Sequence, residues 1–341
     1  RFGLAVLIVK IRFRKEDQLN MKCLVVISLI ASAPAFTVAQ TADSTRTPWG
    51  EPDLQGIWGA GYILTPLERP DEYAGREFLT NEEVAILEGT AAGPGRDQRS
   101  APGTKADVEG AYNDAYSGRG RSVIRTRRTS LIIDPPDGKI PFSVEGRARM
   151  EAEAAFANEI RDRAHHPEDQ KDDRCEGITL PVEYGGARVS GGHSRIVQNP
   201  DQVSFYYESG HQGGQYRDIP LDGRGHPPDH VRQWFGHSVG RWEGDTLVVD
   251  VSNFSDKTSF HGSHENLHLV EHFTRPESDL LIYRVTIDDP TTFTHPWTIE
   301  VPLVLLDNKT NQIYESACQE GNYSLTSILA GERALERAGR R

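Results

Sequence analysis

The sequence predicts a mainly β (α+β) fold, an antiparallel β-barrel or strongly curved sheet with peripheral helices. From residue 196 onward, short apolar runs follow one another with no helical pattern between them, which is typical of sandwiches and barrels and not of βαβ sheets. Turn sequences such as Glu243-Gly244-Asp245 and Asp288-Asp289-Pro290 separate these runs. The candidate strands cover residues 203–207, 216–219, 246–251, 266–273, 280–287 and 298–305.

The residues before these runs predict one strand and the first peripheral helix. A short strand is expected near Ile57 and Trp58, after a segment rich in Pro, Gly and aromatic residues. Thr80 is followed three residues later by Glu83, which is the pattern of a capping box and predicts a helix over residues 81–89.

The middle of the chain predicts a hairpin and a long helix. Residues 127–133 lead into a Pro-Pro-Asp-Gly turn and then residues 139–140, a strand–turn–strand pattern. Residues 144–163 are rich in Ala, Glu and Arg and predict a helix with Met150, Phe156, Ala157 and Ile160 on one side. A last helix is expected over residues 324–337.

The N-terminal region has the pattern of a secretory signal peptide. Met21 and Lys22 precede a continuous apolar run over residues 23–36, and small residues follow up to Ala39. The run is shorter than the roughly 20 residues that a spanning helix needs. We expect residues 1–39 to be an upstream leader and signal peptide, and residues 40–341 to be a single mature domain, periplasmic or secreted.

The net charge of the mature chain limits the classes of partner that it can bind, and its cysteines leave two redox states open. Residues 1–39 hold six Lys or Arg and two Asp or Glu, so their removal changes the net charge from −12 to −16. Such an acidic chain is a poor partner for nucleic acid or for anionic membrane surfaces, so we expect a small-molecule ligand or substrate, and no membrane association after signal cleavage. Cys175 and Cys318 either pair in an oxidising compartment or stay free thiols, and the sequence leaves both open.

Several motifs together resemble a known family. They are Pro48-Trp49-Gly50-x-Pro52-Asp53-Leu54-Gln55-Gly56-x-Trp58, Thr65-Pro66-Leu67-Glu68-Arg69-Pro70, Arg128 to Gly138, Trp242-Glu243-Gly244-Asp245-Thr246-Leu247-Val248-Val249-Asp250, Glu265-Asn266-Leu267-His268 and Cys318-x-Glu320-Gly321-Asn322-Tyr323. Over nearly the whole mature chain, the sequence resembles a large family of exported bacterial proteins labelled only hypothetical. The resemblance implies export and a single-unit fold, and it implies no activity.

A second, shorter resemblance concerns the predicted first strand. Gly56-Ile57-Trp58 is similar to the Gly-x-Trp at the first strand of lipocalin-like barrels, which would make the barrel lipocalin-like. An aromatic core residue after a turn glycine explains the same three residues.

One motif matches a metal-binding pattern. His264-Glu265-Asn266-Leu267-His268 fits the H-E-x-x-H pattern of zinc hydrolases, with His272 as a possible third ligand. That chemistry requires a helix, so that both imidazoles reach one Zn²⁺ from the same helix face. Residues 266–273 instead lead through a tight turn into a clear strand, which favours a hairpin arm. No cofactor is therefore expected, and zinc bound by His264, His268 and His272 is the alternative.

As a strand, the same residues form two different faces. Leu267, Leu269 and Phe273 share one face, whereas His268 and His272 share the other with Arg284 of the next strand. The polar face either meets solvent, as half of most antiparallel sheets does, or lines the barrel interior and binds a ligand.

The functional hypothesis is that the protein binds, and transforms by His/Glu acid–base chemistry, a small organic molecule in a barrel pocket. A non-catalytic binding module and the zinc hydrolase are the alternatives, and the sequence does not decide whether the protein is an enzyme. Histidine suits the acid–base role because its pKa lies near neutrality. Glu208-x-x-His211 with Arg217 is a second short segment combining an acid, a base and a cation. The candidate catalytic residues are His268, Glu265, His211 and Arg217, and the candidate ligand-binding residues are Arg284, His272, Trp58 and Trp242.

Overall fold

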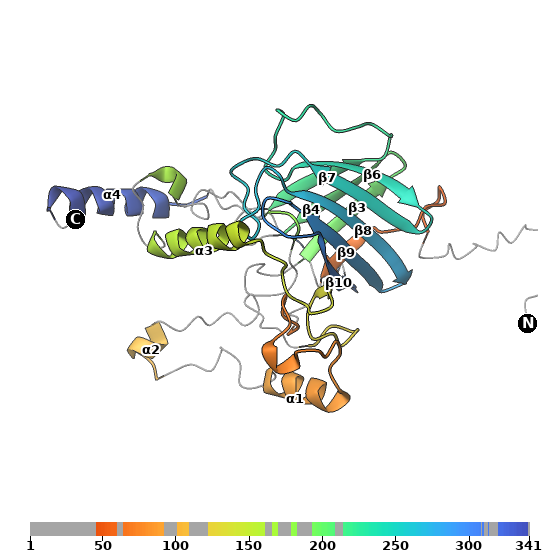
Figure 1. Ribbon diagram of the computed structural model, residues 1–341, viewed down its shortest axis with the longest axis horizontal. Helices are drawn as coiled ribbons and strands as arrows, with labels where there is room; N and C mark the ends of the chain where they lie inside the picture. Colours follow the sequence, from red (N-terminus) through yellow and green to blue (C-terminus); the bar gives the residue numbers. More distant parts are fainter. Residues whose placement is uncertain are drawn as a thin grey trace, which may run out of the picture. The chain divides into compact units, whose positions relative to one another are not determined.

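The computed structural model describes most of the region from residue 46 to residue 339 (Figure 1). The described residues are 46–59, 64–91, 101–108, 122–160, 166–169, 179–182, 193–208, 214–307, 309, 313 and 320–339. The predicted signal peptide, Cys175, Cys318 and His211 lie outside them. The chain divides into two units, residues 1–41 and the unit that begins at Ala42, and the fold described below belongs to the second.

The fold is a nearly closed antiparallel barrel, as predicted. Nine strands follow the order β5-β4-β3-β1-β10-β9-β8-β7-β6, and β2 pairs with β10 beside this path. Every pairing between these strands is antiparallel. The strands are β1 (Gly56–Gly59), β2 (Ile132–Asp134), β3 (His193–Asn199), β4 (Gln202–Tyr207), β5 (Gln215–Pro220), β6 (His237–Glu243), β7 (Thr246–Ser252), β8 (His268–Glu277), β9 (Leu280–Asp288) and β10 (Trp297–Leu306).

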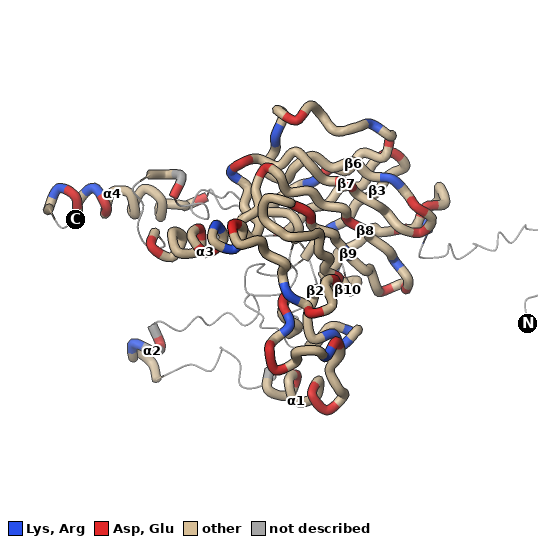
Figure 2. The backbone as a smooth tube through the Cα atoms, viewed as in Figure 1, with Lys and Arg blue, Asp and Glu red and all other residues tan. Residues whose placement is uncertain are grey.

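Alternating burial along each strand gives the barrel an apolar interior. On β4, for example, Val203, Phe205 and Tyr207 are buried, whereas the residues between them are partly exposed. Trp58 is also part of this core, fully buried, and its indole N–H donates to the Leu54 carbonyl over 2.8 Å. Many of the charged residues lie on the helices and in the connections between strands (Figure 2). The predicted alternation of apolar and polar residues along the strands therefore places the hydrophobic core inside the barrel.

The barrel has a seam where its two end strands, β5 and β6, approach without a backbone ladder. Gly240 of β6 makes the approach possible, because a Cβ there would lie 2.7 Å from the side chains of both Ile219 and Leu221. Glycine weakens a strand pattern, and β6, like β3, was not among the candidate strands. Close packing at the seam thus explains why β6 contains a glycine, a residue with low strand propensity.

The helices are α1 (Asn81–Ala91), α2 (Lys105–Val108), α3 (Val144–Glu159) and α4 (Ser324–Arg337), with short 3-10 turns at Asp71–Tyr73 and Pro167–Asp169. The predicted capping box is confirmed at α1: the Thr80 N–H donates to Glu83 over 2.8 Å, and the Glu83 N–H donates to the Thr80 hydroxyl over 3.2 Å. The bounds of α4 match the prediction. No helix in the described ranges is long and apolar enough to span a membrane.

Two local predictions differ from the structure. Of the side expected to be apolar on α3, Ile160 is buried but Phe156 is 52% exposed, because the helix contacts the barrel near its N-terminus, where Gly146 lies against the Thr292 backbone. The hairpin expected around the Pro-Pro-Asp-Gly turn does not form: β2 pairs with β10, and the N–H of Ile140 donates to the Glu68 carboxylate. Residues 139–140 therefore form no returning strand.

Candidate functional site: a histidine–aspartate cluster

The predicted polar face of β8 and β9 lies on the outside of the barrel. Leu269 and Glu271 of β8 are fully buried in the interior, whereas His268 and His272 alternate with them and face outward. Arg284, which pairs with His272, faces outward as well, and its side chain is 51% exposed. Of the two alternatives for this polar face, the structure therefore has the one in which it points away from the interior, because the apolar face of the hairpin occupies the interior.

On this outer face, three histidines and one aspartate form a connected group, which we call the histidine–aspartate cluster: His226, His237, Asp250 and His268. Asp250, on β7, is its centre. The Nε2 atom of His226 lies 2.8 Å from Oδ1 of Asp250, and Nε2 of His268 lies 3.1 Å from Oδ2. Nδ1 of His226 lies 3.0 Å from Nδ1 of His237. The cluster is partly open to solvent, with the His268 side chain 42% exposed.

Four segments of the chain position the cluster. His237 is the first residue of β6 and His268 the first of β8, so both lie at strand ends beside Asp250. His226 belongs to the connection between β5 and β6. The side-chain amide of Asn253 holds this connection in place, because it donates to the carbonyls of Pro227 and Val231 over 3.2 and 3.1 Å.

The surroundings shift the pKa values of the cluster residues in different directions. The hydrogen bond from His268, with a second one from His226, holds the pKa of Asp250 below its ordinary value, although partial burial opposes this. The same hydrogen bond to Asp250 raises the pKa of His268. Partial burial, with smaller contributions from the neighbouring His226 and Arg224, lowers the pKa of His237. Near neutrality the cluster therefore combines a carboxylate, an imidazole that favours its charged form and one that favours its neutral form.

The hydrogen bonds also determine where the protons lie. A carboxylate only accepts, so Nε2 of both His226 and His268 must donate to Asp250. A neutral His226 then accepts from Nδ1 of His237, which leaves the lone pair of His237 on Nε2. If Nε2 of His237 takes up a proton, its Nδ1 proton can pass to His226, and the positive charge comes to lie next to Asp250. This arrangement is a proton relay with a base at its outer end.

The zinc alternative does not fit this geometry. Residues 264–267 form a turn and His268 begins a strand, so His264 and His268 do not share a helix face. The Nδ1 and Nε2 atoms of His264 lie 2.6 Å from the Thr258 carbonyl and 2.6 Å from the Glu153 carboxylate, which leaves no lone pair for a metal. Within the described ranges, no group of three or more His, Cys, Asp or Glu residues is arranged to hold a metal ion.

Arg217 belongs to a different polar group, inside the barrel. Its guanidinium donates to both carboxylate oxygens of Glu271 and, over 2.9 Å, to the hydroxyl of Ser238. Tyr283 donates to Glu271 over 2.8 Å. Burial raises the pKa of Tyr207, which also contacts Arg217, to about 12. Because Arg217 faces inward and His268 outward, the predicted catalytic residues do not form one site.

The remaining predicted residues are distributed around the barrel. Glu265 is exposed, and its backbone carbonyl, not its carboxylate, accepts from Arg232 over 2.7 Å. His272 is half buried, its pKa is lowered by burial and by Arg284, and its Nδ1 atom has no hydrogen-bond partner. Trp58 is a core residue, and Trp242 packs partly buried against the core.

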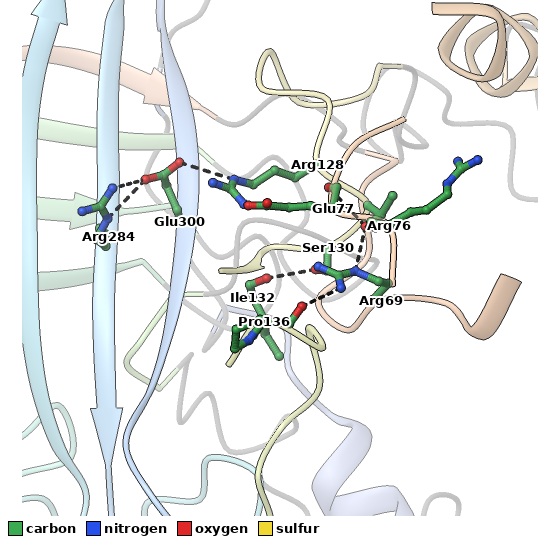
Figure 3. A network of polar contacts seen from close by, with 10 residues as sticks. Arg69, Arg76, Glu77, Arg128, Ser130, Ile132, Pro136, Arg284 and Glu300 are labelled. Carbon is green, nitrogen blue, oxygen red and sulfur yellow. Dashed lines mark hydrogen bonds and ion pairs between the residues drawn. The ribbon is translucent and has the colours of Figure 1, made fainter. Parts of the chain in front are cut away.

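Arg284 takes part in a chain of ion pairs that crosses the outer face (Figure 3). It donates to Glu300 of β10, which also lies 4.0 Å from Arg128, and Arg128 pairs with Glu77. The chain ties the segment around residue 77 to the barrel. The guanidinium of Arg284, a candidate ligand-binding residue, is thus already bound to a carboxylate.

Sequence reasoning identified His268 but missed Asp250, His226 and His237 as its neighbours. A signal for Asp250 was present: it is the carboxylate at an outward position of the apolar strand Thr246–Ser252. His226 carried no such signal, because it reaches the cluster from an irregular connection whose path depends on Asn253. Comparisons of the chain with protein-family models, curated proteins and solved structures give no match.

Proposed function

We propose that this protein binds a small organic molecule at the histidine–aspartate cluster and exchanges protons with it. The observation that carries the proposal is the shared carboxylate: Asp250 joins two imidazoles, and a third, His237, extends the chain through His226. His237 acts as the base through its Nε2 atom. His268, held in its charged form by Asp250, acts as the acid through its Nδ1 proton.

In this relay the carboxylate of Asp250 has a defined role, which is to stabilise the positive charge that proton transfer creates. When the Nε2 atom of His237 removes a proton from a ligand, the charge that develops is transferred to His226, where Asp250 stabilises it. His268 can then return a proton to another atom of the ligand. A small molecule with an acidic C–H bond next to a carbonyl group fits this combination of base and acid.

The proposal can be tested by ligand-observed NMR with a set of small ketones, esters and carboxylic acids. We expect some compounds to bind the wild type and the control variant His295→Ala, whose exposed histidine lies outside the cluster, but not Asp250→Asn. In D₂O the bound compounds should incorporate deuterium at the carbon beside the carbonyl, and His237→Ala should abolish incorporation while binding persists. Binding without incorporation in the wild type would favour a non-catalytic binding module, and binding that is unaffected by Asp250→Asn would refute the site.

Export of the mature chain is part of the same proposal. It is supported by the apolar run over residues 23–36 after Met21 and by the resemblance to exported bacterial proteins. Expression from Met21 in a bacterial host should deliver the protein to the periplasm or the medium with an N-terminus near Gln40. N-terminal sequencing of the fractionated protein measures this, and a cytoplasmic protein that retains Met21 would contradict it.

A further inference from the structure

A second group of polar residues, away from the cluster, joins helix α3 to the barrel. His264 lies between the Thr258 carbonyl and the Glu153 carboxylate, at 2.6 Å from each. The other oxygen of Glu153 accepts from the hydroxyl of Ser259 over 2.6 Å. Glu153 belongs to α3, whereas the other three residues belong to the connection between β7 and β8. The contact therefore links two elements that are distant in the sequence.

The chemistry of these partners requires His264 to carry two ring protons. A carbonyl oxygen has no proton to donate, and an ionised carboxylate has none either. Both nitrogens of His264 must then donate, and the imidazole is positively charged. If it loses one proton, one of the two 2.6 Å contacts becomes a lone pair facing a lone pair, which is repulsive.

Other contacts bring α3 to the same place but do not depend on this proton. Arg149 donates through Nε to the Gly262 carbonyl over 2.7 Å and through its terminal nitrogen to the Thr292 hydroxyl over 2.7 Å. At Gly262 a Cβ would lie 3.0 Å from the Met150 backbone nitrogen, so the helix and the connection are closely packed. The helix thus has a permanent contact at Arg149 and a charge-dependent one a single turn later, at Glu153.

We propose that His264 and Glu153 form a pH-dependent clamp, which holds α3 on the β7–β8 connection while His264 is charged and loosens when it is neutral. The charged groups that act on His264 are Glu153 and Arg149 of α3. Its own connection also carries Asp256, Lys257, His261 and Glu265, and Asp289 of the β9–β10 connection accepts from the adjacent Ser263. The clamp is independent of the cluster's function and depends only on these contacts.

The direction of the effect follows from the hydrogen bond to Glu153. This bond raises the pKa of His264 above its ordinary value of 6.5, although burial and Arg149 oppose it. A group whose pKa is raised by folding stabilises the folded form fully below the unfolded pKa, and this stabilisation is lost as the pH rises through the folded pKa. The clamp is therefore closed in mildly acidic solution and opens on the alkaline side of pH 6.5.

Hydrogen exchange of the α3 amides tests the clamp, with Glu153→Gln as the matched variant. A glutamine amide can donate to neutral His264, and its oxygen can still accept from Ser259, so the variant keeps the contact with no charge. In the wild type, after correction for intrinsic rates, we expect the protection of α3 to fall roughly fivefold from pH 6 to pH 9, as loss of one hydrogen bond implies. In Glu153→Gln the protection should not change with pH.

NMR titration of the His264 ring in the wild type gives a second measurement that does not need a folded variant. We expect His264 to titrate above the ordinary histidine value of 6.5. Titration of His264 at or below 6.5 would overturn the proposal, as would equal pH dependence of α3 protection in the wild type and Glu153→Gln. Should Glu153→Gln fail to fold, the titration alone decides.

Discussion

At the scale of single residues, Asp250 raises the pKa of its neighbour His268. Its carboxylate accepts from both His226 and His268, and the bond from His268 favours the charged form of that imidazole. Among the described residues, no carboxylate bonds to His237, whose pKa is lowered mainly by burial. One strand residue thus separates the histidines of the cluster into an acid and a base.

Replacing Asp250 by Asn tests this role directly. The amide keeps the size of the side chain but removes its charge, so the pKa of His268 should fall toward the ordinary histidine value. The cost in stability should stay below about 1 kcal/mol, because the group is partly exposed and solvent screens it. Histidine NMR titration measures the change in pKa, and urea unfolding measures the stability. An unchanged titration of His268 in Asp250→Asn would show that another group holds its proton.

Inside the barrel, the pair formed by Arg217 and Glu271 supports a second residue-scale prediction. Arg217→Met leaves the fully buried carboxylate of Glu271 without its cation, and such uncompensated charges cost about 3–5 kcal/mol. The double variant Arg217→Met/Glu271→Leu removes both charges and should regain most of this loss. Chemical denaturation of the three proteins measures the difference. A double variant no more stable than Arg217→Met would contradict the prediction.

At the scale of elements, the seam between β5 and β6 depends on the absence of a side chain at position 240. Gly240→Val would place new atoms where the side chains of Ile219 and Leu221 already lie, and overpacking of this kind costs about 1–3 kcal/mol. Gly89→Ala is the control, since Gly89 lies in helix α1 with open space around it and alanine there is neutral or slightly stabilising. Thermal unfolding compares the two variants. Equal melting temperatures would mean that the seam tolerates a side chain at position 240.

Elements also show how far the sequence could predict the structure. Alternating apolar residues and turn residues predicted β4, β5 and β7 to β10, because an antiparallel strand buried on one face leaves a strong local pattern. Strands were also expected near Ile57 and over residues 127–133, where β1 and β2 form, so eight of the ten strands were predicted. β3 and β6 have weaker local patterns. β6 contains Gly240, and the reason for a glycine there is the close approach of β5, which the sequence does not reveal. The returning strand after β2 was predicted wrongly, because a local turn pattern does not reveal that Ile132 pairs with β10 instead.

The candidate site was harder to predict than the fold for the same reason. The local pattern placed His268 on a polar strand face, but which face of a sheet becomes the interior is decided by how the whole barrel closes. Glu271 shows this clearly: it is a carboxylate on the apolar side of β8, and it is buried only because Arg217 reaches it from β5. Contacts between strands that are distant in the sequence cannot be predicted from the local spacing of residues.

At the scale of the whole molecule, the groups whose pKa changes on folding predict the pH at which the folded state is most stable. Folding raises the pKa of His264 and His268, so their contribution is complete below 6.5 and is lost as the pH rises through the folded pKa. Folding lowers the pKa of His237 and His272, mainly through burial, so stability is lost as the pH falls from 6.5 through their folded pKa. Asp250 adds a further loss as the pH falls below 3.8. The domain should therefore be most stable near pH 6.5.

The double variant Glu153→Gln/Asp250→Asn separates the two sides of this maximum. It removes the carboxylates that hold protons on His264 and His268, so the decline above pH 6.5 should disappear, whereas the decline below it, due to His237 and His272, should remain. In the wild type the alkaline decline should be on the order of 1 kcal/mol, because both imidazoles are partly exposed and solvent screens their ion pairs. Melting temperatures between pH 5 and pH 9 measure both profiles. A variant that still loses stability above pH 6.5 as steeply as the wild type would show that other groups carry the alkaline decline.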